Sequence, residues 1–191
     1  MAQEKEHSGY LPGHLLVAMP QMSDPRFARS VVFLCAHSAD GAMGLVVNKI
    51  VGSVKFNELL RQFDIDAPTG GDAMEVYFGG PVESGRGFVL HTPDYEAEGT
   101  MRVDDRFALT ASLDILRSIA SGKGPAKALL ALGYAGWAGG QLDGEIQANG
   151  WLNVPADHEL VFGHDNDHKW SQAAAKVGID LSLLSSAAGH A

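Results

Sequence analysis

The chain has 191 residues, 46% of them hydrophobic, and a formal net charge of −9. This length and composition fit one globular domain and exclude a disordered chain. The sequence also contains no apolar run of the roughly 20 residues that a membrane-spanning helix needs. Lysine and arginine are scattered and form no basic run, which argues against a nucleic-acid partner because nucleic-acid-binding surfaces work by neutralising phosphates.

The N-terminal segment comes first. It is polar and lacks the basic-then-apolar order of a secretory signal, so we expect a flexible tail over residues 1–12 and a single domain over residues 13–191. Cys35 is the only cysteine, which excludes an intramolecular disulfide. A lone cysteine without a secretory signal predicts a cytoplasmic protein.

A strand and a hairpin follow. Residues 15–18 form a short apolar run that predicts a buried strand. Residues 30–37 and 42–50 are apolar and β-branched, and Ser38-Ala39-Asp40-Gly41 separates them. Because an Asp-Gly pair adopts positive φ at little cost, these segments are predicted to form a β-hairpin.

The expected hairpin register brings a thiol and an imidazole together. If residues 38–41 form the loop, His37 pairs with Ala42 and Cys35 pairs with Gly44, which places Cys35 and His37 on one face. Such a pair could supply a nucleophile or a redox sensor. The alternative is a small buried thiol beside a hydrogen-bonded histidine, since the sequence offers no evident oxyanion hole or orienting carboxylate.

The rest of the chain mixes helices and strands without a regular β-α-β rhythm. This mixture predicts an α+β domain with a mixed, largely antiparallel β-sheet flanked by helices. The expected helices cover residues 53–63, 112–122, 141–147 and 170–178, the expected strands cover 75–78, 87–91, 101–103, 107–110 and 159–162, and residues 127–132 fit either.

Several segments resemble signature segments of the YqgE/AlgH family. They are Gly13–Pro20 (GHLLVAMP), Ser30–Lys49 with its Gly-Ala-Met-Gly-Leu-Val-Val-Asn-Lys ending, Gly79–Val82 (GGPV), Gly133–Leu152 with its Gly-Tyr-Ala-Gly-Trp start, and the C-terminus from Gly178. The resemblance implies a compact mixed fold and no established catalytic activity. Because some members are linked to regulation of alginate production, it also implies a transcriptional role as an alternative.

Glycine-rich and aromatic segments suggest a binding site. Gly-Gly pairs can bring bare backbone close to a ligand, an arginine can pair with a carboxylate, and aromatic rings with polar residues one helical turn apart can form walls and a rim. The predicted ligand-binding residues are Gly79, Gly80, Pro81, Arg86, Tyr134, Gly136, Trp137, Gly140, Gln141 and Glu145. The alternative is turn geometry for the glycines and core packing for the tryptophans.

A histidine pair is the candidate for a metal. His164 and His168 have the i, i+4 spacing of a helix, with Asp165, Asp167 and His158 nearby, in a segment that departs from the family pattern. Such residues could bind zinc or nickel, or they could form the solvated start of a helix. No nucleotide-binding, hydrolase or zinc-protease motif occurs, so no cofactor is predicted.

These observations favour a non-catalytic binding module, with an indirect regulatory role, whose partner is an unknown small molecule or protein. The alternatives are a transcriptional regulator and an enzyme or thiol sensor that uses Cys35 and His37. No membrane partner is expected, and the oligomeric state stays open.

Overall fold

A computed structural model describes residues 9–68 and 74–187 of the chain. The strands are β1 (His14–Ala18), β2 (Val31–Ser38), β3 (Gly41–Val46), β4 (Val76–Phe78), β5 (Val82–His91), β6 (Met101–Arg102), β7 (Ala108–Thr110), β8 (Ala128–Ala138) and β9 (Trp151–Pro155). The helices are α1 (Phe56–Gln62), α2 (Leu113–Ala120), α3 (Gln141–Gln147), α4 (His158–Phe162), α5 (Asn166–Ala175) and α6 (Leu181–Ala187).

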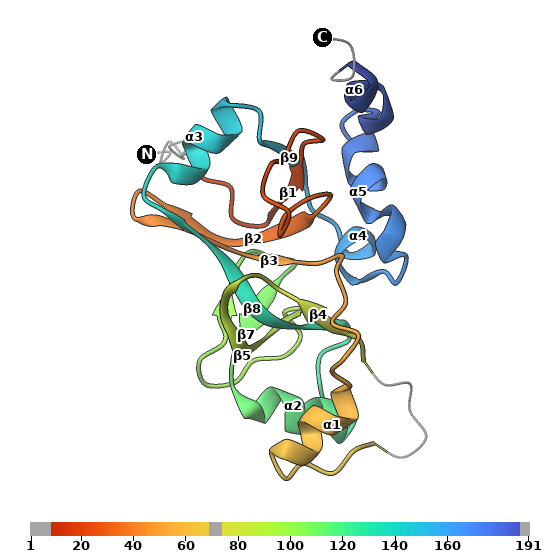
Figure 1. Ribbon diagram of the computed structural model, residues 1–191. Coiled ribbons are helices and arrows are strands. Elements are labelled where there is room, and N and C mark those ends of the chain that lie inside the picture. The colour runs from red at the N-terminus through yellow and green to blue at the C-terminus, as the bar shows by residue number, and fades with distance from the viewer. Residues whose placement is uncertain (1–8, 69–73, 188–191) are drawn as a thin grey trace, which may run out of the picture.

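The strands form one sheet in the order β6-β7-β5-β8-β3-β2-β1-β9, with β4 paired to β8 outside this path (Figure 1). The β4–β8 pair is parallel and the other strand pairs are antiparallel. The predicted α+β fold, with a mixed and largely antiparallel sheet flanked by helices, is confirmed. No helix in the described part of the chain is long and apolar enough to cross a membrane.

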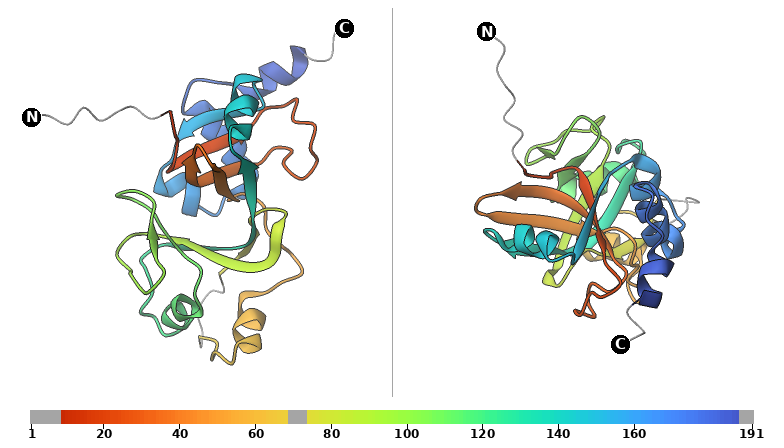
Figure 2. Two further views of the ribbon diagram at one scale, coloured as in Figure 1. Left: turned by 90° about the vertical axis from the view of Figure 1, so that its left-hand side faces the viewer. Right: turned by 90° about the horizontal axis from the view of Figure 1, so that it is seen from above.

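β8 connects the two ends of this sheet. Its C-terminal part pairs with β3, whereas its N-terminal part lies between β4 and β5. Helices α1 and α2 lie at one end of the molecule, and α3 lies with the C-terminal helices at the other (Figures 1 and 2). The long β8 strand therefore belongs to both ends.

The core follows from the alternation of side chains along the strands. Leu15 and Val17 of β1 enter a cluster that includes Ala173 of α5, while Leu16 enters another that includes Leu142 of α3. A third cluster holds α1 and α2 against β4, β5 and β8. Because successive residues of a strand point to opposite faces, helices cover both faces of the sheet.

The predicted hairpin is confirmed, but its register differs from the expected one. His37 pairs with Ala42 as predicted, whereas Gly44 pairs with Leu34 instead of Cys35. A β-bulge at Cys35 inserts one unpaired residue, and a bulge changes the alternation of side chains beyond it. Cys35 enters the core cluster of α5, whereas His37 faces Asp143 of α3.

The sequence assigned one further segment wrongly and left another open. Residues 159–162 form helix α4 instead of the predicted strand, because the Asp157 side chain accepts a hydrogen bond from the Leu160 N–H at 2.8 Å and caps the turn. The segment 127–132 fitted strand or helix, and its residues from Ala128 onward belong to β8. Strand β9 and helix α6 were not predicted.

The N-terminal segment contacts the sheet from Tyr10 onward. The Leu11 N–H donates to Nδ1 of His37 at 3.2 Å, and the Tyr10 ring packs edge-on against the same imidazole at 5.0 Å. Most of the predicted tail, residues 1–8, lies outside the described residues. So do residues 188–191 at the end of the chain.

Candidate functional site

Gly79 and Gly80 lie where the chain passes from β4 to β5. Both are buried, and a Cβ on Gly79 would overlap the Gly133 carbonyl oxygen, while one on Gly80 would overlap the backbone of Tyr134. Their missing side chains therefore let this crossing pack directly on β8. The bare backbone at these two glycines is covered by protein, so it does not line a hollow.

A groove of about 780 Å³ lies on the face of the sheet between the β2–β3 hairpin and strands β5, β6 and β7. It brings together four of the predicted residues, which are Arg86, Tyr134, Gly136 and Trp137. The other lining residues are Ala36, Ser38, Asp40, Gly41, Ala42, Met43, Val82, Phe88, Gly99, Met101, Leu109 and Ala111. The predicted residues Gly79, Gly80, Pro81, Gly140, Gln141 and Glu145 are not part of this lining.

The groove is largely apolar, with one cation on its wall. The Arg86 guanidinium lies over the Phe88 ring, 5.0 Å from its centroid, and 3.4 Å from a Glu83 oxygen. Val82 and Met101 are 37% and 40% exposed, so apolar surface extends beyond the hollow. This composition suits an apolar occupant with a small number of polar contacts.

Gly136 forms an open part of the floor. A Cβ placed on it would touch the Tyr134 ring at 3.4 Å and the Val82 side chain at 3.9 Å, without meeting backbone. A side chain at position 136 would therefore project into the groove.

The edge of β8 beside this floor has no strand partner. β5 pairs with β8 only as far as Tyr134, and no described residue pairs with that edge of β8 at Gly136. The Ala138 N–H points away from β3, because it donates to Oε1 of Gln141 at 3.0 Å. Backbone direction repeats every second residue, so the Gly136 N–H and C=O also point toward the open side.

Glu145 and Gln141 lie outside the groove lining and have structural partners. Glu145 Oε2 accepts hydrogen bonds from Nε1 of Trp137 at 2.8 Å and Nε1 of Trp151 at 2.9 Å, and Gln141 donates to Oε1 at 3.2 Å. This carboxylate holds α3 against β8 and β9.

A chain of hydrogen bonds holds in place the wall of the groove that Gly99 and Met101 form. The Nδ1 of fully buried His91 lies 2.7 Å from the Thr92 carbonyl oxygen, so it carries the proton, and Nε2 accepts from Thr110 Oγ1 at 2.8 Å. Thr110 Oγ1 in turn accepts from Thr100 Oγ1 at 2.8 Å, and Thr100 accepts from the Ala97 N–H. Burial lowers the pKa of His91. The neutral imidazole thus holds the loop that carries Gly99 and Met101.

Cys35 and His37 lie on different faces of β2. Cys35 is 3% exposed, and burial raises the pKa of its thiol to about 12. Because His37 Nδ1 accepts from the Leu11 N–H, its proton is on Nε2, which lies 3.2 Å from an Asp143 oxygen. The imidazole therefore lies between the N-terminal segment and α3.

The two candidate metal ligands do not share a helix. His164 precedes α5, so it is not one helical turn from His168, and Nδ1 of His168 lies 2.8 Å from Asp165. Among the described residues, no group of three His, Cys, Asp or Glu side chains could hold a metal ion.

Lys169 is a residue that the sequence did not single out. Its side chain is buried, and its Nζ donates to the carbonyl oxygens of Val47 at 2.8 Å and Val161 at 3.0 Å. It also lies 5.3 Å from the centroid of the Tyr77 ring. Burial lowers its pKa to about 8. Nothing in the sequence around Lys169 indicates that this lysine is buried with two carbonyl oxygens as its hydrogen-bond partners.

Known proteins resemble this chain along most of its length. A UPF0301 protein of Afipia carboxidovorans is 57% identical over 190 residues, covering 95% of this chain and 90% of the relative. A UPF0301 protein of Rhodospirillum rubrum is 56% identical over 187 residues, covering 98% and 97%.

Solved structures agree with the fold. The solution structure of the AlgH protein from Pseudomonas aeruginosa matches with a TM-score of 0.79 and 43% identity over 100% of both chains. A crystal structure of a Corynebacterium diphtheriae protein, DIP2367, matches with a TM-score of 0.73 and 25% identity over 91% of both chains. The profile of the AlgH-like family (DUF179) matches residues 15–182. The chain therefore belongs to the AlgH-like family.

Proposed function

We propose that this protein is a non-catalytic cytoplasmic binding module whose groove takes an extended apolar segment of a partner protein. The observation that carries this proposal is the unpaired edge of β8 at Gly136 beside a largely apolar groove. A peptide that adds to such an edge as a further strand gains main-chain hydrogen bonds, while pockets take its alternate side chains.

The groove lining supports an apolar segment. The mostly buried side chains that line it include Met43, Phe88 and Leu109. The flexible thioether of a methionine can adapt to varied apolar partners. The exposed Val82 and Met101 extend this surface, as apolar patches at partner-binding sites do.

The other two functions have less support. An enzyme or redox sensor at Cys35 needs a reachable thiolate, and burial opposes both access and ionisation. A direct role on DNA is opposed by the net charge of −9. A regulatory role would then be indirect, through the partner protein.

The test is a selection of short random peptides, displayed on phage, for binding to the wild-type protein. Each selected peptide is then measured against Gly136→Leu, which projects into the groove, and against Gly85→Ala, whose added methyl meets nothing within 4 Å. We expect Gly136→Leu to weaken binding at least about tenfold and Gly85→Ala to leave it unchanged. Thermal melting checks that both variants are folded.

Methylation of the peptide backbone distinguishes strand addition from simple apolar contact. Methylating alternate peptide nitrogens should abolish binding in one register and spare it in the other, because strand addition uses every second N–H. The proposal fails if no peptide is enriched, if the enriched peptides bind both variants equally, or if methylation has no effect in either register.

A further inference from the structure

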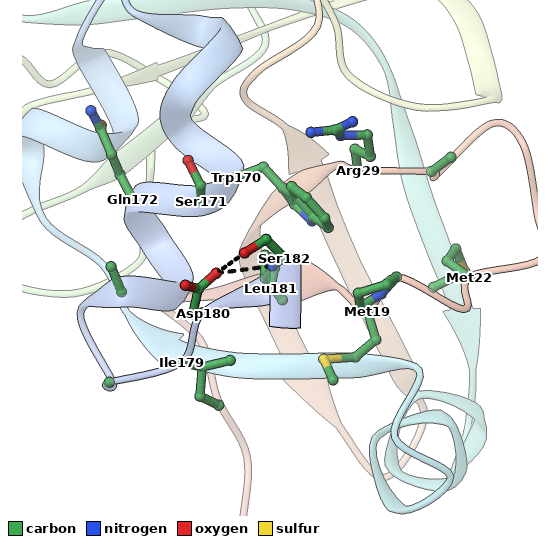
Figure 3. A pocket seen from close by; sticks show the side chains of 14 residues that line it. Met19, Met22, Arg29, Trp170, Ser171, Gln172, Ile179, Asp180, Leu181 and Ser182 are labelled. Carbon is green, nitrogen blue, oxygen red and sulfur yellow. Dashed lines mark hydrogen bonds between the residues drawn. The ribbon is translucent and has the colours of Figure 1, made fainter. Parts of the chain in front are cut away.

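A second hollow, of about 820 Å³, lies between the loop that joins β1 to β2 and the C-terminal helices. Met19 and Met22 come from the loop, Trp170 comes from α5, and Ile179 and Leu181 come from the turn and the start of α6. Figure 3 shows the Trp170 indole between Arg29 and Met19. The volume is in the range of small-molecule sites.

The backbone at Arg29 is held in an unusual conformation. Its φ is 56°, in the left-handed region that residues other than glycine rarely adopt. The Arg29 carbonyl oxygen accepts from Nδ2 of Asn48 at 3.0 Å, and Oδ1 of Asn48 accepts from the Val31 N–H at 2.9 Å. Lys49 donates to the Arg26 carbonyl oxygen at 3.0 Å. Two side chains that follow β3 therefore fix the loop that presents Arg29.

The Arg29 side chain is oriented by Trp170. The guanidinium carbon lies 4.6 Å from the centroid of the indole, whose own Nε1–H donates to the Ala18 carbonyl oxygen at 2.8 Å. Stacking engages the face of a guanidinium group and leaves its in-plane N–H donors for an acceptor. The aromatic ring and the donors above it are thus arranged before any ligand binds.

The hollow contains one positive and one negative side chain, Arg29 and Asp180, whose charges restrict the kind of ligand that fits. No Asp or Glu in the described part of the chain forms an ion pair with Arg29. Asp180 also lines the hollow, but its Oδ1 accepts from the N–H of Ser182 at 3.0 Å and from the Ser182 hydroxyl at 2.6 Å, at the start of α6. These hydrogen bonds lower the pKa of Asp180, so its negative charge persists at neutral pH.

We infer that this hollow binds a monocarboxylate with a flat apolar body. The carboxylate accepts hydrogen bonds from Arg29, which can donate two in parallel to such a group. The flat body lies against Trp170 and the methionines, whose thioethers pack well on aromatic rings. A second negative charge on the ligand is disfavoured, because Asp180 lines the same hollow.

The probe is 1-naphthaleneacetate, with the neutral 1-naphthaleneacetamide as its isostere and 1-naphthyl phosphate as a dianion. The chain has three tryptophans, so their indole N–H signals in ¹⁵N spectra report separate places. Trp170 reports this hollow and Trp137 reports the groove. We expect the carboxylate to shift the Trp170 signal saturably and to bind at least about tenfold more tightly than the amide.

Variants of two arginines on one loop separate a specific contact from net charge. Arg29→Gln should reduce binding of the carboxylate to the level of the amide, and Arg29→Lys should give an intermediate affinity because it keeps the charge but loses the paired donors. Arg26→Gln is the matched control, because Arg26 already pairs with Asp24 at 2.7 Å. It should bind like the wild type.

Any of four results would overturn the inference. The carboxylate could leave the Trp170 signal unchanged up to its solubility limit, or bind no more tightly than the amide. Arg26→Gln could weaken binding as much as Arg29→Gln does. The phosphate could bind more tightly than the carboxylate, which would exclude a monocarboxylate as the preferred class.

Discussion

The indole Nε1–H of Trp137 donates a hydrogen bond to the Glu145 carboxylate at 2.8 Å, and the same oxygen accepts from Trp151 at 2.9 Å. Trp137 and Trp151 are 7% and 4% exposed, so removal of the carboxylate would leave two buried donors without this acceptor. One side chain of a short helix thus stabilises two strands that are not neighbours in the sheet.

Glu145→Ala should therefore lower the free energy of unfolding by about 2–4 kcal/mol, since each unsatisfied buried donor costs roughly 1–3 kcal/mol. Glu145→Gln should cost less, because its amide oxygen can still accept. Urea denaturation followed by tryptophan fluorescence measures both. Gln147→Ala, at an exposed position of the same helix, is the control. A loss below about 0.5 kcal/mol for Glu145→Ala would contradict the structural role.

Gly80→Ala should destabilise the fold by about 3 kcal/mol or more, or prevent folding, because the new methyl would overlap the Tyr134 backbone. Neither the crossing chain nor β8 can move away without breaking the pairing of β5. Thermal unfolding compares this variant with Gly85→Ala, which adds a methyl in open space. Equal melting temperatures would show that the β4–β5 crossing has room for a methyl group beside β8.

Lys169 predicts a stability change at alkaline pH. Its pKa is about 8 in the folded protein against an ordinary value of 10.5. Between these values the unfolded chain holds more protons, so the free energy of unfolding should rise with pH, by at most about 3 kcal/mol over the whole window. Below the pKa of Lys169 in the folded protein, both the folded and the unfolded chain hold the proton, so the contribution of Lys169 to the free energy of unfolding does not change with pH.

Lys169→Met isolates this effect. The centroid of the Tyr77 ring lies 5.3 Å from Lys169 Nζ, and burial raises the pKa of Tyr77 above 10.0, so its ionisation in the unfolded chain lowers stability only at the top of the pH range. Urea unfolding from about pH 7 to pH 10 should therefore give a wild-type curve that rises relative to the variant. Parallel curves would mean that Lys169 titrates normally.

Cys35 should be nearly inert in the folded protein. A thiol pKa of about 12 instead of 9.0 means a thiolate fraction roughly a thousandfold smaller at neutral pH, before access is considered. Alkylation by iodoacetamide, followed by mass spectrometry, should be slow in buffer and fast in urea. Ser38→Cys, at an exposed position of the same strand, gives the rate of an accessible thiol in the folded chain. Rapid alkylation of native Cys35 would reopen the catalytic alternative.

Local patterns in the sequence were sufficient for much of the fold. The Asp-Gly turn and its apolar flanks predict the hairpin, apolar spacing predicts α1 and α2, and flanking glycines predict α3. The residues that form each of these signals are close in the sequence, so the signals can be recognised without knowledge of the tertiary structure. The apolar run of α4 has three residues, which is too short to show whether apolar residues recur with the period of a helix or of a strand.

The candidate site depended on contacts that no local pattern encodes. A bulge at Cys35 changes which face His37 occupies, and nothing in an apolar strand indicates where an extra residue will be inserted. Gly79 and Gly80 were expected to bring backbone close to a ligand, but the neighbour that they approach is β8. Arg86, Tyr134, Gly136 and Trp137 do meet at one groove, because they come from paired strands of one sheet.

The shared strand β8 has a consequence for dissecting this protein. Its C-terminal residues pair with β3 at the end of the sheet that holds β1, β2 and β9, and its N-terminal residues pair with β4 and β5 at the end that holds β6 and β7. A truncation that keeps only one end of the molecule must therefore also carry the part of β8 that pairs there, or it leaves β3 or β5 without that strand neighbour. A fragment that ends or begins within residues 128–138 should therefore lose strand pairing at one end of the sheet or at both.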